Sequence, residues 1–332
     1  MKPSRRICRV GLGLAVALML TPVGYADAEF QASGSLKPVI REPWIQITGN
    51  PDLGTLTSPK QQPVDFALWQ AADGTWQVLE CIRNTRESGE TRLLYRWEGK
   101  ELTAPAWVPQ GIAMRADPTL GETKGGLQAP FIFREGDAFQ MFYGDWNHIC
   151  RATSSDGKHF SRVVQLNGQT GLFGEGEGAN TRDPMVLKVA GTYYCYYAAY
   201  PGDKCSVYCR TSTDLNAWSQ PKQVAFGGFA GEGKFSAECP FVVERTPGNF
   251  YLFRTQHYGT AAYTSVYFSN DPMDFGISHD QGHLVCTLPV AAPEIVKFQD
   301  QYYIAALLPS LKGIQIARLD WVNDEITPRN KD

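Results

Sequence analysis

Helical patterning is what this 332-residue sequence most lacks. No long stretch repeats apolar residues at the spacing of an amphipathic helix, which argues against a helix bundle. Beyond residues 10–20, no apolar run approaches the length needed to span a bilayer as a helix. CxxC pairs and His/Cys clusters at zinc spacing are also missing, so we expect neither a metal site nor a cofactor.

Basic charge is scarce as well. The whole chain has 31 Lys and Arg residues against 34 Asp and Glu residues, a formal net charge of −3. Without residues 1–28 the balance is 27 basic against 33 acidic side chains, or −6. Nucleic acids and anionic membranes both select for clustered positive charge, so we expect neither as a partner.

The N-terminus has the three parts of a signal peptide. A basic segment that includes Arg5 and Arg6 precedes the apolar residues 10–20, and Ala26-Asp27-Ala28 supplies small residues for cleavage. No cysteine follows the apolar run, so a lipid anchor is not expected. We therefore expect residues 1–28 to be removed and residues 29–332 to form a secreted or periplasmic domain.

Seven cysteines remain after residue 28, and an odd number leaves at least one thiol free in an exported protein. Cys205 and Cys209 are close enough in sequence to pair across a short hairpin in an oxidising compartment. Cys195 and Cys239 lie in apolar, strand-like runs and are typical of small buried hydrophobic residues.

Short alternating runs rich in aromatic and β-branched residues predict strands instead of helices. Five segments share one pattern, an apolar strand, a tight turn and an aromatic strand. They begin at Pro63 (PVDFALWQ), Gln128 (QAPFIFRE), Thr181 (TRDPMVLK), Ala237 (AECPFVVE) and Ala291 (AAPEIVKF). Glycine precedes the aromatic strand in four of them, as a hairpin turn with positive φ favours.

A second repeat, Ser-x-Asp-x-x-x-aromatic, begins at Ser154, Ser212 and Ser269. It predicts a turn between outer strands, with the aromatic ring packed between neighbouring units. Five units of four antiparallel strands fill residues 60–325, so we predict an all-β, five-bladed β-propeller in a single domain. Residues 36–48 are expected to complete the last blade beside residues 313–319, and we expect a monomer.

Polar residues at the starts of the inner strands should face one funnel at the mouth of the propeller. These are Asp65, Gln128, Arg182, Asp183, Glu238 and, two residues further in, Glu294. Three carboxylates from different blades suit glycoside hydrolysis, which needs one protonated carboxyl and one ionised carboxyl.

The tripeptides Arg182-Asp183-Pro184 and Glu238-Cys239-Pro240 resemble the RDP and ECP motifs of the five-bladed propeller glycosidases, the arabinanase, levansucrase and invertase superfamily. The resemblance covers the whole propeller in blade order. It implies that Asp65 is the base or nucleophile, that Asp183 binds the sugar and tunes the acid, and that Glu238 is the acid. The blade-one sequence Val64-Asp65-Phe66 has neither the Asp-Pro usual in family 43 nor the Asn-Asp-Pro-Asn of family 32. Because the signature of the retaining family is absent, we expect inversion.

Further residues near the funnel are candidates for substrate binding: Arg182, Gln128, Trp146, Arg254, His257 and Glu294. Structural roles remain open for several of the candidate catalytic and binding residues. Asp183 and Arg182 fit an ion pair at a strand entrance, Asp65 fits a turn cap, and Glu294 fits a buried partner of an arginine.

The sequence thus predicts a secreted glycoside hydrolase whose partner is an oligo- or polysaccharide. Two alternatives stay open. One is a carbohydrate-binding propeller without catalysis, in which the carboxylates only hold hydroxyl groups. The other is glycosyl transfer or phosphorolysis, which would need several cationic groups in the funnel, where Arg182, Arg254 and His257 are the candidates.

Overall fold

The alternating apolar runs form 22 strands, five single-turn 3₁₀ helices and no α-helix within residues 34–323, which are the residues that this computed structural model describes. The expected signal peptide, residues 1–28, lies outside that range. No helix in the described range is long and apolar enough to cross a membrane.

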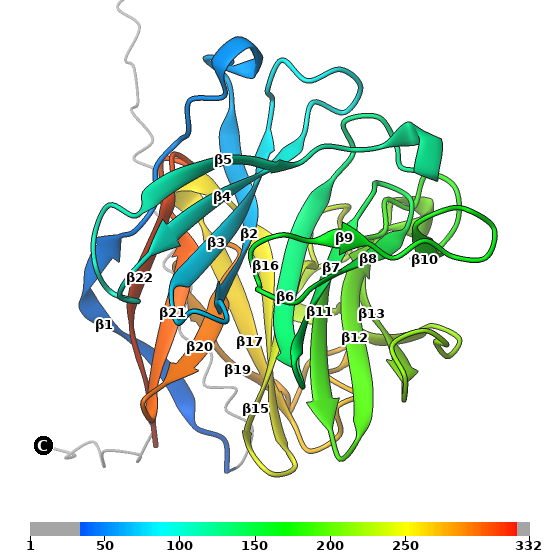
Figure 1. Ribbon diagram of the computed structural model, residues 1–332. Helices are drawn as coiled ribbons and strands as arrows, with labels where there is room; N and C mark the ends of the chain where they lie inside the picture. Colours follow the sequence, from blue (N-terminus) through cyan, green and yellow to red (C-terminus); the bar gives the residue numbers. More distant parts are fainter. Residues whose placement is uncertain (1–33, 324–332) are drawn as a thin grey trace, which may run out of the picture.

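The strands form five sheets that are the blades of a propeller (Figure 1). Blade 1 contains β2 (Gln62–Gln70), β3 (Trp76–Arg83), β4 (Leu93–Gly99) and β5 (Val108–Met114). Blade 2 contains β6 (Gln128–Glu135), β7 (Ala138–Gly144), β8 (Ile149–Ser154), β9 (Ser161–Arg162) and β10 (Gly171–Phe173). Blade 3 contains β11 (Arg182–Val189), β12 (Thr192–Ala199), β13 (Ser206–Ser212) and β14 (Lys222–Gly227), with β18 (Ile277–Ser278) added in parallel to β14.

Blade 4 contains β15 (Glu238–Thr246), β16 (Asn249–His257), β17 (Tyr263–Ser269) and β19 (Leu284–Leu288). Blade 5 contains β20 (Glu294–Phe298), β21 (Gln301–Leu307), β22 (Ile314–Val322) and β1 (Lys37–Gln46). The 3₁₀ helices are η1 (Gly54–Leu56), η2 (Pro118–Leu120), η3 (Pro201–Asp203), η4 (Gly228–Ala230) and η5 (Gly259–Ala261). The predicted five-bladed, all-β fold is confirmed, with a fifth short strand on blades 2 and 3.

The ring closes through the strand nearest the N-terminus. β1 pairs antiparallel with β22 from Lys37 opposite Val322 to Gln46 opposite Gln315, and the two lie side by side in Figure 1, blue beside dark red. A blade cannot cover its own apolar faces, so this pairing completes blade 5 and lets it pack against blade 1. The expected pairing of residues 36–48 with residues 313–319 is confirmed.

Burial follows from this packing of blades against one another. β3 is buried at seven of its eight residues because neighbouring blades cover both of its faces, whereas the outer strand β5 is mostly exposed. The predicted aromatic plugs also pack between blades. Phe160 contacts Trp69 of blade 1, Trp218 contacts Phe142 of blade 2, and Phe275 contacts Tyr196 of blade 3.

All seven cysteines of the described residues are free thiols. Cys205 directly precedes β13 and Cys209 lies within it, so they follow one extended strand and do not face each other across a hairpin. Four residues of strand span about 13 Å, which is beyond the reach of a disulfide. The expectation that these two residues could pair is therefore wrong for this fold.

Candidate active site at the mouth of the propeller

The inner strands of blades 1 to 4 share a β-bulge at the entrance to the central tunnel. Pairing with the second strand shifts register after the first residue of β6, β11 and β15, and between Pro63 and Asp65 in β2. In three of these blades the residue at the bulge has positive φ, and these residues are Ala129, Asp183 and Cys239. In blade 5 no register shift occurs within β20, but Ala292, just before that strand, also has positive φ. Bulges commonly redirect side chains beside active sites, and this one places the same position of each blade at the tunnel.

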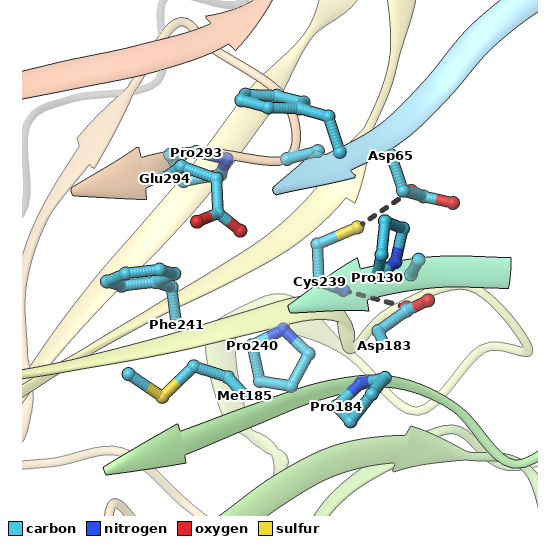
Figure 2. Close-up of a pocket in the computed structure, with 13 residues that line it drawn as sticks. Asp65, Pro130, Asp183, Pro184, Met185, Cys239, Pro240, Phe241, Pro293 and Glu294 are labelled. Atoms are coloured by element: carbon cyan, nitrogen blue, oxygen red, sulfur yellow. Dashed lines mark hydrogen bonds between the residues drawn. The ribbon is translucent and has the colours of Figure 1, made fainter. Parts of the chain in front are cut away.

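The bulges arrange side chains in layers. The first layer consists of the residue directly before the bulge position in each of blades 1 to 4. These residues line a wide upper pocket of about 520 Å³: Val64, Gln128, Arg182 and Glu238. The second layer consists of the next residue of each blade. These residues form a ring at the base of that pocket: Asp65, Ala129, Asp183, Cys239 and Ala292. The ring and the next residue of each blade, Phe66, Pro130, Pro184, Pro240 and Pro293, line a second, much smaller cavity. Figure 2 shows the four prolines of this layer.

The structure brings the three predicted carboxylates together, because Asp65, Asp183 and Glu238 all line the upper pocket. Asp65 is 6% exposed. Its Oδ1 accepts a hydrogen bond from the Cys239 thiol at 3.1 Å, and its Oδ2 lies 3.9 Å from Nη1 of Arg92. Burial raises the pKa of Asp65, while Arg92 and the Cys239 thiol act in the opposite direction. Burial is the largest influence and the pKa of Asp65 is raised overall, and its cationic and hydrogen-bonding neighbours limit that rise.

Asp183 lies beside Asp65 and is 5% exposed. Its Oδ2 accepts the backbone N–H of Cys239 at 2.9 Å and lies 3.6 Å from Nε of Arg182. Burial, followed by the nearby charge of Asp65, raises the pKa of Asp183 to about 6. A negative charge at this position disfavours ionisation of the neighbouring carboxyls.

Glu238 forms an ion pair with Arg182, whose Nη2 lies 2.8 Å from Oε1 of Glu238. Arg182 also donates to the carbonyl oxygen of Asn180 and lies over the ring of Tyr200. Burial raises the pKa of Glu238, the charge of Arg182 opposes that rise, and the charge of Asp183 adds to it. Burial is the largest influence, so the environment favours the protonated carboxyl that a general acid needs.

Besides Arg182, three predicted binding residues line the same pocket, namely Gln128, Trp146 and His257. Gln128 is completely buried, and within residues 34–323 neither polar atom of its side chain has a hydrogen-bond partner. Trp146 has a φ of 87°, a conformation rare for a bulky residue and often found at functional sites. His257 is exposed and its ring stacks on Tyr263.

Two predicted binding residues lie elsewhere. The guanidinium of buried Arg254 donates to the carbonyl oxygens of Ser236, Gly227 and Gly231, so it holds the loop before β15 and does not face the pocket. Glu294 lines the second, smaller cavity, across it from Asp65 in Figure 2. Burial raises its pKa well above the usual range, and within residues 34–323 no arginine contributes to that shift or forms an ion pair with Glu294.

Sequence analysis missed four residues that line or support the pocket: Cys239, Tyr258, Arg83 and Arg92. Cys239 aligns with Asp183 in the blade repeat, so the repeat itself places it in the ring. Arg83 ends β3 and Arg92 directly precedes β4. The second strand of each blade returns to the mouth where the first began, so topology alone indicates a location near the funnel for both arginines.

One group of potential metal ligands occurs in the described part of the chain: the ligand atoms of Asp65, Asp183 and Cys239 lie within 4.8 Å of one another. Binding a metal through sulfur requires the thiolate. Burial and the three neighbouring carboxylates raise the pKa of the Cys239 thiol well above its usual value. The protonated thiol instead serves as a hydrogen-bond donor to Asp65.

No protein-family model and no curated protein sequence matches the chain. Solved structures do match. An endo-arabinase from Bacteroides thetaiotaomicron is 12% identical with a TM-score of 0.61, over 82% of this chain and 99% of the other. A thermostable family-43 glycoside hydrolase is 14% identical with a TM-score of 0.58, over 84% and 94% of the two chains. A family-32 β-fructofuranosidase from Bombyx mori is 14% identical with a TM-score of 0.56, over 82% and 61%.

The chain has the five-bladed fold of these glycoside hydrolases. The resemblance predicted from the RDP and ECP tripeptides is thereby confirmed at the level of the fold. At these identities the match defines the scaffold, and the chemistry has to be argued from the pocket itself.

Proposed function

We propose that this protein is a glycoside hydrolase that cleaves a glycosidic bond of an oligo- or polysaccharide in the upper pocket. The observation that carries the proposal is that Asp65, Asp183 and Glu238, from three different blades, line one pocket at the mouth of the tunnel. Such a set supplies a base, an acid and a third carboxylate whose charge helps to keep the pKa of the acid above that of the base.

In the proposed mechanism Asp65 is the base and activates a water molecule for attack on the anomeric carbon. Arg92 and the Cys239 thiol limit the rise that burial causes in the pKa of Asp65, and so favour the ionised form that a base needs. Glu238 is the acid and protonates the leaving oxygen, and the charge of Asp183 helps to retain the proton on Glu238 until then. Gln128, whose buried amide has no hydrogen-bond partner within residues 34–323, lines the pocket and is our candidate to bind a sugar hydroxyl. We propose inversion at the anomeric carbon and export of the protein through residues 1–28.

A second candidate, a carbohydrate-binding propeller without catalysis, is favoured by one contact. The 2.8 Å ion pair between Arg182 and Glu238 stabilises the ionised carboxylate, and an ionised Glu238 cannot donate a proton. In that case the carboxylates would act only as hydrogen-bond acceptors for hydroxyl groups.

A screen of aryl glycosides and polysaccharides distinguishes the two. The hydrolase proposal expects wild-type protein to release sugar from at least one substrate, and the Asp65→Asn variant to lose that activity. Isothermal titration of the same glycans should accompany the screen. Binding of glycans by wild type without cleavage of any would establish the carbohydrate-binding function and reject the hydrolase.

A further inference from the structure

We propose that Arg83 and Arg92 form a subsite for an anionic group, a carboxylate, sulfate ester or phosphate, beside Asp65. The inference rests on the proposed function, because it defines the substrate of the same pocket. The anion is either part of the sugar or a free phosphate that takes the place of water.

The two arginines lie opposite each other at the pocket end of blade 1. β3 and β4 pair antiparallel up to Ile82 opposite Leu93, and one further step in that register puts Arg83 opposite Arg92. Both residues line the upper pocket. Like charges directly opposite on neighbouring strands destabilise a sheet. A bound anion between or above them would remove that cost.

Arg83 has no carboxylate partner among the ion pairs of residues 34–323. Its Nε and Nη2 donate to the amide oxygen of Gln62 at 3.2 and 3.0 Å, and that acceptor is neutral. The guanidinium has five N–H donors, so donors remain for a ligand.

Arg92 is even less well paired, although its side chain is only 15% exposed. Its closest acceptor is the Cys81 sulfur at 3.8 Å, a weak acceptor, and Oδ2 of Asp65 at 3.9 Å is beyond hydrogen-bond distance. The Trp146 ring lies 5.3 Å from the guanidinium carbon and holds it from one side. In the described part of the chain no oxygen atom accepts a hydrogen bond from this side chain. Guanidinium groups so buried normally have acceptors, and the open side of this one is the pocket.

The charge balance of the pocket points the same way. Its lining includes, against three carboxylates, four basic residues: Arg83, Arg92, Arg182 and Lys234. Lys234 is paired with Asp203, outside the lining, at 3.3 Å. Arg182 is paired with Glu238, and a Glu238 that acts as an acid is neutral before the reaction. With Lys234 compensated by Asp203, the three arginines then exceed the two remaining carboxylates, Asp65 and Asp183, by one positive charge, in a chain whose net charge is −3. Neutral sugars need no such excess, whereas a planar guanidinium pair matches the oxygen atoms of an oxyacid group.

Paired ligands that differ only in charge test the subsite. Suitable pairs are oligogalacturonates with their methyl esters, and sulfated galactan oligosaccharides with their desulfated forms. We expect wild type to bind the anionic member of one pair roughly 10- to 100-fold more tightly, as charge-assisted hydrogen bonds allow. Arg83→Gln should lose this preference, and Arg83→Lys should keep part of it. Arg134→Gln, a change to an exposed arginine of blade 2, should leave it intact.

The second part of the experiment uses inorganic phosphate as the ligand. If phosphate is the anion, it should bind alone with an affinity that Arg83→Gln reduces, and it should accelerate glycan cleavage. An oxygen of phosphate then bonds to the anomeric carbon, the glycosidic bond breaks, the leaving oxygen takes the proton of Glu238, and a sugar 1-phosphate is formed. Acceleration by phosphate identifies the free anion, and a preference for acidic glycans without it identifies an anion borne by the sugar.

Two results would overturn the subsite. The first is that wild type binds the charged and neutral members of every pair equally well and does not bind phosphate. The second is that the preference for anions survives in Arg83→Gln. Circular dichroism and a thermal melt of each variant show that it is folded, and Arg83→Lys provides the second variant. Failure of the hydrolase proposal is a separate result, because anion preference without any cleavage would leave the subsite standing.

Discussion

The Cys239 thiol donates a hydrogen bond to Asp65 with a sulfur–oxygen distance of 3.1 Å, and so links the start of blade 4 to the start of blade 1 across the tunnel. The same sulfur lies 3.1 Å from the hydroxyl oxygen of Tyr258, and the backbone N–H of Cys239 binds Asp183. One residue therefore orients two of the three carboxylates. Cys239 acts through Asp65 and is a positioning residue.

Cys239→Ala should raise the pKa of Asp65 because it removes a donor that favours the carboxylate. Asp65 must be ionised to act as a base, so activity is present above its pKa, and a raised pKa moves the acidic limb of the kcat/KM profile to higher pH. Cys239→Ser keeps a donor and should leave the limb close to that of wild type. A pH profile in which both variants match wild type would show that this hydrogen bond does not tune Asp65.

Glu238→Gln should reduce turnover of a natural linkage by roughly 10²–10⁴-fold while sugar binding survives, since the amide keeps the shape but has no proton to transfer. An aryl glycoside with a good leaving group needs little protonation and should be affected less. The measurement compares kcat for both substrates in wild type and variant. Equal losses on the two substrates would indicate a binding role for Glu238 rather than acid catalysis.

The product should form with inverted configuration at the anomeric carbon. Inversion requires a water molecule between the base and the sugar and carboxyls separated by roughly 6.5–9.5 Å, whereas retention needs about 5–5.5 Å. Proton NMR during the first minutes of hydrolysis, before mutarotation, identifies the anomer. The retained anomer, with a glycosyl group trapped on Asp65 and detected by mass spectrometry, would reassign Asp65 as a nucleophile.

The fold and the three carboxylates could be predicted because both depend on the repeat. The inner strands of blades 1 to 4 begin with a similar bulge, so aligning the repeats is enough to bring Asp65, Asp183 and Glu238 to one pocket. Cys239 occupies the same repeat position as Asp65 and Asp183, but its apolar neighbours in the sequence suggested a core residue. Composition alone does not show that the bulge turns its side chain toward the tunnel.

The arginines could not be placed by the same reasoning. Arg254 is adjacent to Thr255, the partner of Glu238, and successive strand residues point to opposite faces. In a propeller those two faces meet different blades, so Arg254 extends away from the pocket to the loop before β15. Arg83 and Arg92 belong to no repeated motif, because only blade 1 has this pair where β3 and β4 meet the pocket.

A buried glutamate lies where β1 and β22 close the ring against blade 1, and its ionisation should make the free energy of unfolding depend on pH. Glu80 of β3 is fully buried, accepts a hydrogen bond from Nε1 of Trp97 at 2.9 Å and is hydrogen-bonded to the Thr48 hydroxyl. Thr48 follows β1 and also accepts the N–H of Ile314 at the start of β22. Glu80 therefore connects blade 1 to both strands that close blade 5. Burial raises its pKa from 4.5 to about 8.

Between pH 4.5 and 8 the folded chain keeps a proton on Glu80 that the unfolded chain releases. The free energy of unfolding contributed by this group is therefore fully present below pH 4.5 and falls as pH rises toward 8, by at most about 1.4 kcal/mol per pH unit. Glu80→Gln keeps a neutral, hydrogen-bonding side chain and should make urea-unfolding free energies flatter across this window. Glu101→Gln, at an exposed glutamate, is the control and should keep the wild-type slope. If Glu80→Gln kept that slope as well, another group would be responsible for the pH dependence of ring closure.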